Sequence, residues 1–265
     1  MTPVALTVAG SDSGGGAGIQ ADLKTFSALG VYGASVLAAL TAQNTRGVQA
    51  IHEVPAAFVA AQLDSVLSDL PVHAVKVGML ARPDAIEAVA AALSARALPV
   101  VLDPVMVATS GDRLLRPEAV ATLRARLLPL ALVVTPNLPE AAALLDEAVA
   151  GDEATMRDQG ERLLALGARA VLMKGGHGTG RESVDLLVER GGVTRLAAPR
   201  VETANTHGTG CTLSAAIAAG LARGLDLGEA VRAAKDYLTA ALIAGRDLGI
   251  GAGHGPVHHF HAWWR

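Results

Sequence analysis

From Val54 to Thr135 the chain alternates between segments with helical periodicity and short apolar segments. In chain order these are a helix at 55–70, a strand at 73–78, a helix at 83–98, a strand at 100–103, a helix at 117–127 and a strand at 132–135. Pro83 and Pro117 stand at first helical positions, where a missing N–H group costs no hydrogen bond. Such alternation is typical of a parallel sheet covered by helices. It predicts a three-layer α/β/α fold with a mostly parallel central sheet flanked by helices.

The same architecture is expected toward both ends of the chain. A strand at 3–9, a glycine-rich loop at 10–18, a helix at 19–29 and a strand at 32–40 come first. Later segments are a helix at 152–166, a strand at 169–173, an antiparallel hairpin of strands at 183–189 and 193–198, and helices at 212–222 and 228–244. With 51% hydrophobic residues, 18% charged residues and no linker-like segment, we expect one domain spanning residues 1–265.

Charge and composition exclude several classes of partner. A net charge of -3 offers no basic surface for nucleic acid, and 3% aromatic residues provide few stacking platforms. No apolar stretch reaches the roughly 18 residues of a membrane span, and the run from Val4 to Ala9 is too short for a signal peptide. The single cysteine excludes an intrachain disulfide. We therefore expect a cytoplasmic protein with no nucleic-acid partner and no membrane partner.

Polar residues follow several expected strands, at the sheet edge where ligands bind in α/β proteins. Asp103 ends an apolar strand, where a carboxylate is costly unless it meets a cation or hydrogen-bond donors, and we favour a metal or phosphate role for it. Asn137 and Glu140 match a capping box, which needs no ligand. Glu140 could serve both purposes, because Mg²⁺ keeps several waters and takes one or two carboxylates.

The segment 205–211 (NTHGTGC) is a candidate anion site, because a glycine-rich loop here leads into an apolar helix. Gly208 and Gly210 permit backbone angles that direct successive N–H groups at one anion, at the positive end of the helix. Cys211 would then face the group to which the anion is transferred. A tight strand-to-helix turn without a ligand is the alternative interpretation.

The loop at 10–18 is also rich in glycine, but it matches neither the dinucleotide motif nor the P-loop motif. It predicts only that backbone lies close to a small ligand. Asp12 and Asp22 are candidate polar contacts near that ligand.

Several isolated side chains have two interpretations each. Gln43 follows an expected strand, where its carboxamide could donate to and accept from a ligand, although a solvated loop glutamine is the alternative. Lys174 ends another strand and could reach a phosphate, whereas Lys235 alone would be read as a surface lysine. The tail at 253–264 concentrates four histidines and both tryptophans. Zinc binding is one interpretation, and we favour a packed C-terminal cap because no cysteine lies nearby.

In combination, these motifs resemble those of the ribokinase-like superfamily. The shared motifs are Gly-Thr-Gly-Cys at 208–211, Asn-x-x-Glu at 137–140, Asp-Pro-Val-Met at 103–106 and Lys-Gly-Gly-His at 174–177. Within it the chain resembles the bacterial hydroxymethylpyrimidine/phosphomethylpyrimidine kinases from about Val4 to Trp264. That resemblance is carried by Gly-x-Asp-x-x-Gly-Gly-Ala-Gly-Ile-Gln-Ala-Asp at 10–22, Ala-Gln-Asn-Thr at 42–45, Gly-Met-Leu at 78–80 and Gly-Pro-Val-His-His-Phe-His-Ala-Trp-Trp at 255–264.

The resemblance implies two ATP-dependent steps of thiamine biosynthesis. The first converts 4-amino-5-hydroxymethyl-2-methylpyrimidine to its monophosphate, and the second converts the monophosphate to the diphosphate. It also implies that Gln43 binds the aminopyrimidine, with further contacts around the ring from Gly10, Asp22, Met79 and Val105.

The same resemblance implies the phosphate end of the site and the assembly. The anion hole and the phosphate contacts would come from Thr206, Gly208, Thr209, Gly210, Lys174 and Lys235. Asp103 and Glu140 would organise Mg²⁺. Members of this family are usually homodimers.

Cys211 occupies the position where most ribokinase-like enzymes carry an aspartate as catalytic base. The pyrimidine-kinase branch carries cysteine there. Because a helix N-terminus can lower the pKa of a thiol toward neutrality, we expect Cys211 to accept a proton from the alcohol in the first step. Two alternatives stay open. One is a pyridoxal or pyridoxamine kinase, and the other is a non-catalytic pyrimidine-binding protein that has lost its base.

Overall fold

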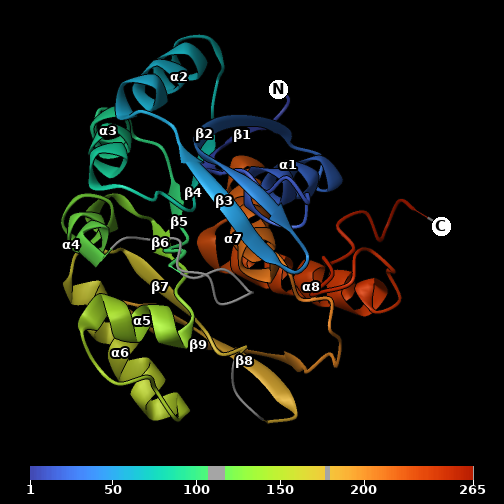
Figure 1. Ribbon diagram of the computed structural model, residues 1–265. Coiled ribbons are helices and arrows are strands. Elements are labelled where there is room, and N and C mark those ends of the chain that lie inside the picture. Colours follow the sequence, from blue (N-terminus) through green and yellow to red (C-terminus); the bar gives the residue numbers. More distant parts are fainter. Residues whose placement is uncertain (107–116, 177–179, 265) are drawn as a thin grey trace.

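A computed structural model describes residues 1–106, 117–176 and 180–264, and one nine-stranded sheet runs through it (Figure 1). The strands are β1 (Val4–Gly10), β2 (Tyr32–Asn44), β3 (Gly47–Glu53), β4 (Ala74–Val77), β5 (Val100–Leu102), β6 (Val133–Val134), β7 (Ala170–Lys174), β8 (Glu182–Glu189) and β9 (Gly192–Pro199). Their order across the sheet is β3-β2-β1-β4-β5-β6-β7-β8-β9. The pairs from β2 to β7 are parallel, whereas β3 at one edge and β8 and β9 at the other are antiparallel.

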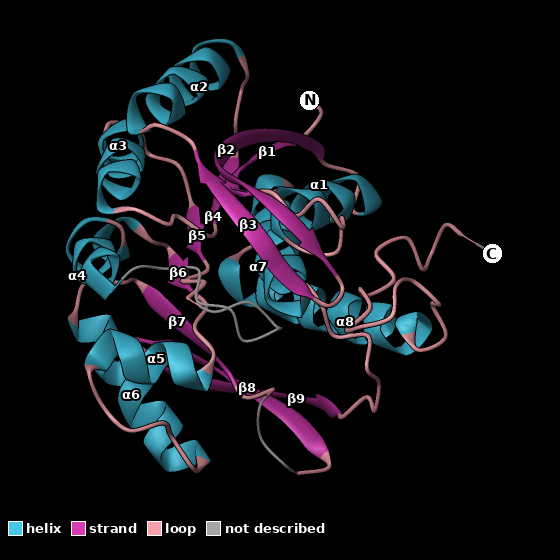
Figure 2. Cartoon of the chain, in the orientation of Figure 1, coloured by secondary structure: helices cyan, strands magenta, loops and turns pink. Residues whose placement is uncertain are grey.

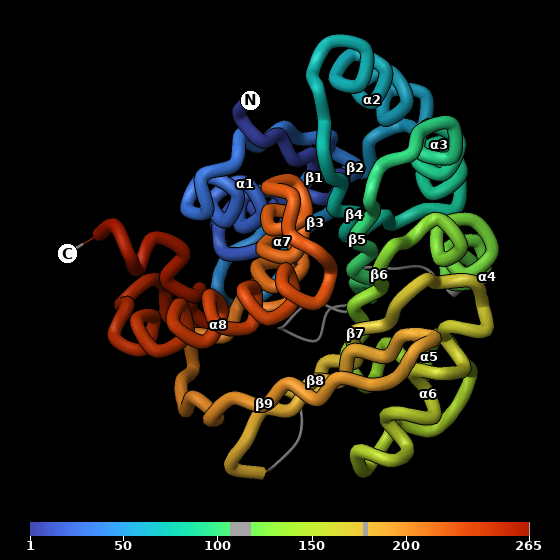
Figure 3. The backbone as a smooth tube through the Cα atoms, turned by 180° about the vertical axis from the view of Figure 1, so that it is seen from behind, coloured from blue at the N-terminus to red at the C-terminus, as the bar shows by residue number. Residues whose placement is uncertain are grey.

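Helices cover both faces of the sheet (Figure 2). They are α1 (Gly18–Ala28), α2 (Ala56–Asp69), α3 (Pro83–Ser94), α4 (Pro117–Arg126), α5 (Leu138–Leu145), α6 (Glu153–Ala165), α7 (Thr209–Ala222) and α8 (Leu227–Gly245), with a short 3-10 helix at Leu128–Leu130. Buried side chains of α2 to α6 share one hydrophobic cluster, and those of α1, α7 and α8 share another. Seen from behind, α1, α7 and α8 lie together, apart from α2 to α6 (Figure 3). The three-layer prediction is therefore confirmed. Within the described ranges, none of these helices is long and apolar enough to span a bilayer.

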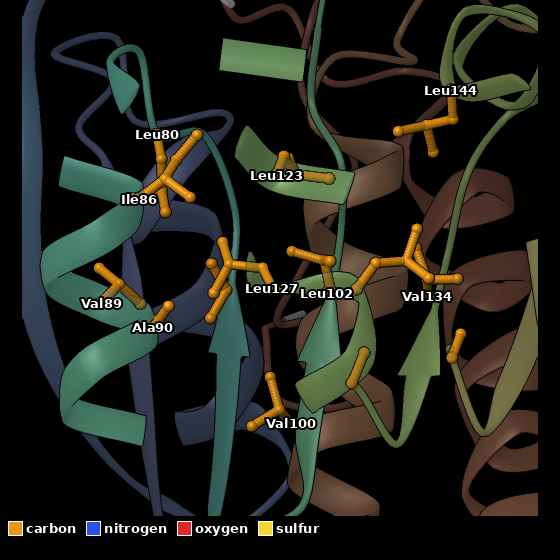
Figure 4. Close-up of a cluster of buried hydrophobic side chains, with 14 of the residues drawn as sticks. Leu80, Ile86, Val89, Ala90, Val100, Leu102, Leu123, Leu127, Val134 and Leu144 are labelled. Atoms are coloured by element: carbon orange, nitrogen blue, oxygen red, sulfur yellow. The ribbon is translucent and has the colours of Figure 1, made fainter. Parts of the chain in front are cut away.

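The larger cluster forms where α3 and α4 pack on β5 and β6 (Figure 4). Leu102 and Val134 of these strands meet Leu123 and Leu127, and each of the four is at most 2% exposed. Burying such a side chain contributes about 1.5–3 kcal/mol. Because parallel strands are covered on both faces, they read as unbroken apolar runs in the sequence.

The hairpin expected at 183–198 is confirmed as β8 and β9, but the expectation for the second strand is wrong at its end. β2 continues past residue 40 to Asn44 and pairs with β3, which the sequence analysis missed. β3 is an edge strand in which Gly47 is the sole buried residue, so it lacks apolar alternation. Gln43 consequently lies inside a strand, beside a bulge at Ala42/Gln43, and not in a loop.

The strand order reverses direction between β1 and β4. From β1 the chain proceeds to β2 and β3 on one side, whereas from β4 it proceeds toward β9 on the other. Ligands of open α/β sheets bind outside the carboxyl ends of the strands at such a switch point. Gly10 ends β1 and Gly78 follows β4, so the sequence motifs at these positions meet there.

Candidate active site

A cavity of about 750 Å³ lies at the carboxyl ends of the parallel strands. It brings together every site residue expected from the sequence except Asp22. The expected residues that line it are Gly10, Gln43, Met79, Asp103, Val105, Glu140, Lys174, Thr206, Gly208, Thr209, Gly210, Cys211 and Lys235. His177, the last residue of the Lys-Gly-Gly-His motif, lies outside the described residues.

The two glycine-rich loops touch at Gly208, immediately before α7. Gly208 has a φ of 77°, in the left-handed region that favours glycine. A Cβ atom at this position would overlap with the carbonyl oxygen of Gly16. Any other residue at 208 would push apart the loop after β1 and the loop before α7, so this glycine is required for close contact as well as for backbone angle.

Asp12 joins the same two loops, a role that the sequence analysis did not foresee. Its carboxylate accepts backbone hydrogen bonds from Gly14, Gly16 and Ala17 at 2.8–3.0 Å, and it lies 2.8 Å from Nε2 of His207. Burial raises the pKa of Asp12, but the contacts with His207 and the backbone outweigh it and lower the pKa overall. Asp12 is thus an organiser of the loops, although it also lines the cavity.

Asp103 and Lys174 form the charged centre of the cavity. Oδ1 of Asp103 accepts hydrogen bonds from Nζ of Lys174 at 2.8 Å and from Oγ1 of Thr135 at 3.0 Å. Oγ of Ser214 donates to Oδ2 at 3.3 Å. Burial raises the pKa of Asp103, but the neighbouring ammonium groups, Lys174 first, hold it below its usual range. The costly carboxylate is therefore stabilised by Lys174 and by hydroxyl donors, and the metal or phosphate role of Asp103 stays a prediction.

Glu140 lies beside this pair and also caps α5. The capping box is confirmed, because the Asn137 side chain accepts from the Glu140 N–H and the Glu140 carboxylate accepts from the Asn137 N–H, both at 2.8 Å. Oε2 of Glu140 lies 3.9 Å from Nζ of Lys174. Burial, with a smaller contribution from Asp103, raises the pKa of Glu140 to about 7.

These residues fit an open magnesium site better than a closed one. Among the described residues, no cluster of three or more histidine, cysteine, aspartate or glutamate side chains could hold a metal. Asp103 and Glu140 supply hard oxygen donors at the edge of a cavity, and Mg²⁺ commonly takes one or two carboxylates together with waters and substrate phosphates.

Cys211 lies in the first turn of α7 with a half-buried side chain. Burial, together with the negative charges of Asp22 and Asp103, raises the pKa of the thiol to about 11. Lys76 opposes this increase but does not overcome it. The expectation of a pKa lowered toward neutrality is therefore wrong, because loss of hydration outweighs the positive end of the helix.

Asp22 does not line the cavity, and Lys76, which the sequence analysis missed, does. The Asp22 carboxylate is fully buried and accepts from Nζ of Lys76 at 2.8 Å and from Oγ1 of Thr7 at 2.6 Å. The sequence did contain a signal for Lys76. Burying a lysine charge inside the apolar strand β4 costs free energy, as burying the aspartate charge after β5 does, so both positions indicate a functional or paired charge.

Lys235 is buried at the far end of the cavity, so the interpretation as a surface lysine is wrong. Its ammonium lies 2.6 Å from Oδ2 of Asp185 and 3.0 Å from the carbonyl of Ser183. The nearby wall is apolar and is formed by Ala198, Val201, Leu238 and Leu242.

The C-terminal tail packs against the site and holds no metal cluster among its described residues. His259 is 5% exposed, and its Nε2 lies 3.1 Å from Oγ1 of Thr212 in α7. The N–H of His207 donates to the carbonyl of Gly255 at 3.0 Å. The favoured interpretation of the tail as a packed cap is therefore confirmed for residues 255–260, whereas Trp263 and Trp264 are exposed.

Comparison with known proteins identifies close relatives. The family model described as phosphomethylpyrimidine kinase matches residues 12–258. The hydroxymethylpyrimidine/phosphomethylpyrimidine kinase of Rhizobium meliloti is 63% identical over 265 residues, covering 100% of both chains. The Escherichia coli kinase of the same description is 59% identical over 261 residues, covering 98% of each chain. Among solved structures, an ADP complex of Bacillus subtilis pyridoxal kinase has a TM-score of 0.92 and 38% identity, covering 100% of each chain.

Proposed function

The chain belongs to the phosphomethylpyrimidine kinase family, and we propose that both phosphorylations of that family take place in the cavity described above. It is a kinase that converts 4-amino-5-hydroxymethyl-2-methylpyrimidine to the monophosphate and then to the diphosphate in thiamine biosynthesis. The alternative of a non-catalytic pyrimidine-binding protein is therefore wrong. The observation that supports a single site is the cavity itself, which joins the acceptor, phosphate and nucleotide motifs.

The acceptor end of the cavity lies over β1 and β2. Gln43 is half-buried, and its Oε1 accepts a hydrogen bond from Oγ1 of Thr41 at 3.1 Å, which orients the carboxamide. Met79 lies directly over Gly10, where a Cβ atom would overlap with its terminal methyl group. We propose that the pyrimidine lies flat between Met79 and Val105 and that Gln43 hydrogen-bonds to its edge.

The transferred phosphoryl group would lie at the N-terminus of α7. The N–H groups of Gly210 and Cys211 belong to the first turn, whose donors have no partners within a helix. Lys174 adds a fixed positive charge beside Gly210, since a Cβ atom there would lie 3.3 Å from the ammonium nitrogen. Both features stabilise charge on the equatorial oxygens during transfer.

ATP would extend from this point toward α8. Similarity to a kinase solved with ADP supports nucleotide binding. Thr206, Thr209 and Lys235 would contact the phosphates, and adenine would lie against the apolar wall near Leu238 and Leu242. Asp103 and Glu140 would hold Mg²⁺, which when bound neutralises charge on the ATP phosphates.

Cys211 would face the acceptor atom as a neutral thiol. With a pKa of about 11 it carries no charge near neutrality. A charged base about 4 Å from the monophosphate would repel it by roughly 4 kcal/mol per unit charge at an effective dielectric constant of 20. A loose transition state for phosphoryl transfer needs little general-base catalysis. The alcohol can therefore lose its proton late, as its oxygen bonds to phosphorus. A neutral thiol therefore suits both acceptors.

We also propose that the chain is one domain over residues 1–265 that forms homodimers in the cytoplasm. The hairpin of β2 and β3 lies at one edge of the sheet and exposes the large apolar side chains of Leu40 and Ile51. Exposed edges and apolar patches of this kind favour pairing with a second chain. A cytoplasmic location suits ATP as co-substrate and an unpaired thiol. Sedimentation at increasing protein concentration tests the dimer, and a constant monomer mass would contradict it.

Pyridoxal is the competing acceptor, because the similar Bacillus subtilis structure is a pyridoxal kinase. Its ring is also flat and bears a hydroxymethyl group. Measuring kcat/KM with ATP and each acceptor decides between the two. We expect a clear preference for the hydroxymethylpyrimidine. A preference for pyridoxal would overturn the substrate assignment and leave the kinase mechanism in place.

A further inference from the structure

Lys76 is a fully buried cation of the cavity that the mechanism above does not use. It lies in β4 between Val75 and Val77, which belong to the cluster under α2 to α6. Because side chains of a strand alternate between faces, Lys76 points the other way, toward α1 and α7. Its side chain is 0% exposed, and it lines the cavity. A charge this deeply buried costs several kcal/mol unless a partner compensates for it.

The partner of Lys76 is Asp22 of α1, and the pair has a defined direction. Nζ of Lys76 lies 2.8 Å from Oδ2 and 3.0 Å from Oδ1 of Asp22, and Oγ1 of Thr7 also donates to Oδ2, at 2.6 Å. Asp22 does not line the cavity, whereas Lys76 does. The positive end of the ion pair therefore faces the acceptor end of the cavity.

Gly78 makes room for this ammonium group. A Cβ atom at Gly78 would lie 2.7 Å from Nζ of Lys76 and 3.0 Å from Cβ of Ala9. Gly78 follows β4 directly and its φ is not in the left-handed region, so the need for glycine here is one of space. The space that a side chain at position 78 would fill is thus taken by the ammonium group of Lys76.

Several charged side chains among the described residues act on Cys211. They include Lys76 of β4, Asp22 of α1, Asp103 after β5 and Lys174 of β7. Lys76 lowers the pKa of the thiol by more than Asp22 raises it. Lys174 is held by Asp103 at the phosphate end, whereas Lys76 is held by Asp22 of α1.

We propose that Lys76 is a positioning residue for phosphoryl transfer, whose ammonium, held by Asp22, presents positive charge to Cys211 and to the acceptor oxygen beside it. This inference rests on the proposed place of Cys211 at the acceptor end. In the first step the hydroxyl oxygen bonds to the γ-phosphorus and its proton passes to an oxygen of the transferred phosphoryl group, while the bond from that phosphorus to the β,γ-bridging oxygen breaks and ADP leaves. A neighbouring ammonium group makes a hydroxyl more acidic, so Lys76 favours the departure of this proton from the acceptor oxygen. In the second step the same charge attracts the monophosphate.

Alkylation of Cys211 measures the charge at this place, because it is the single thiol of the chain and only its thiolate reacts. The main variant is Lys76→Met/Asp22→Asn, which removes both charges and leaves no buried ion unpaired. Replacing a buried ion pair with neutral groups is often neutral for stability. At one fixed, mildly alkaline pH we expect iodoacetamide to react about tenfold more slowly than with the wild type, equivalent to one pKa unit. The kcat of the alcohol step should fall by a similar factor while the thermal midpoint is retained.

Two further variants separate charge from packing. Asp22→Asn alone keeps the ammonium and removes the opposing charge, so alkylation should become faster. Thr7→Val removes the hydrogen bond to Asp22 without changing any charge and should leave the alkylation rate at its wild-type value. An unchanged alkylation rate in the folded double variant would overturn the proposal. If the double variant does not fold, the rate in Asp22→Asn decides instead, and an unchanged or slower rate there would overturn the proposal. A wild-type protein that fails to phosphorylate the pyrimidine would instead overturn the proposed function, since alkylation needs no turnover.

Discussion

The ammonium group of Lys174 lies 2.8 Å from Oδ1 of Asp103, an ion pair that spans from the end of β7 to the residue after β5. β6 lies between these strands. Neighbouring strands are about 4.8 Å apart, so the long lysine side chain crosses two strand spacings along the sheet edge. The pair places one positive and one negative group where Mg²⁺ and the transferred phosphoryl group would meet.

Asp103→Asn tests this arrangement. The change keeps size and much of the hydrogen bonding but deletes the charge that would hold Mg²⁺. We expect kcat to fall by about 10²–10³, the usual cost of removing a preorganised electrostatic group. Thermal unfolding should change far less, because Glu140 still lies 3.9 Å from Lys174. Normal turnover at ordinary Mg²⁺ concentrations would make Asp103 a structural residue.

Gly208→Ala should damage both stability and activity. The matched control is Gly224→Ala, because Gly224 has a φ of 89° but no atom within 4 Å of an added Cβ. The control should cost only the backbone strain of about 1–2 kcal/mol. At Gly208 the new Cβ also overlaps with the carbonyl of Gly16, so unfolding in urea should show a larger loss and kcat should fall. Equal losses of unfolding free energy at the two positions, with kcat unchanged, would show that the contact between the two loops does not matter for stability or activity.

His259 predicts a pH dependence of stability. Burial lowers the pKa of its imidazole from 6.5 to about 4. As the pH falls from about 6.5 to 4, the unfolded chain binds a proton that the folded chain does not, so the free energy of unfolding decreases by up to about 3 kcal/mol. Above pH 6.5 this contribution is fully present. Urea denaturation across this range should show the loss in the wild type and a smaller one in His259→Gln. Parallel curves for the two proteins would refute the assignment.

Cys211→Asp and Cys211→Ala should separate the two steps. The carboxylate of the first variant can accept the alcohol proton but repels the monophosphate, so the alcohol step should survive in part while most of the second step is lost. The alanine variant should lose less in either step than the 10²–10⁴ of a true general base, because the thiol is neutral near pH 7. Each step is measured with its own acceptor. A loss above 10² confined to the alcohol step of Cys211→Ala would show that the thiolate acts as a base.

The sequence predicted the parallel sheet and the residues of the cavity because both depend on patterns along the chain, apolar runs for the strands and glycine-rich loops for the site. It could not predict contacts between distant segments. Asp12 with His207 and Asp22 with Lys76 are pairs separated by 195 and 54 positions, and no local pattern indicates either. The high pKa of Cys211 depends on burial by surrounding elements, so the helix N-terminus alone predicted the wrong direction.

β3 was missed for a different physical reason. An exposed edge strand needs no apolar alternation, because one of its faces and one of its edges meet water. The pairing of Ala42 with Ala50 and of Gln43 with Val48 comes from the tertiary fold. The role of Gln43 therefore rested on the family motif, since its position inside a strand was not visible in the sequence.

Gln43→Ala tests whether the same cavity binds both acceptors. Leaving the polar edge of the pyrimidine without its partner should weaken binding by about 1–3 kcal/mol. The control is Asn44→Ala, because Asn44 is the next residue of β2 and does not line the cavity. KM and kcat are measured separately for the hydroxymethylpyrimidine and for its monophosphate. If both acceptors share this site, Gln43→Ala raises KM for both by the same factor and Asn44→Ala changes neither. A rise for one acceptor alone would contradict a shared site.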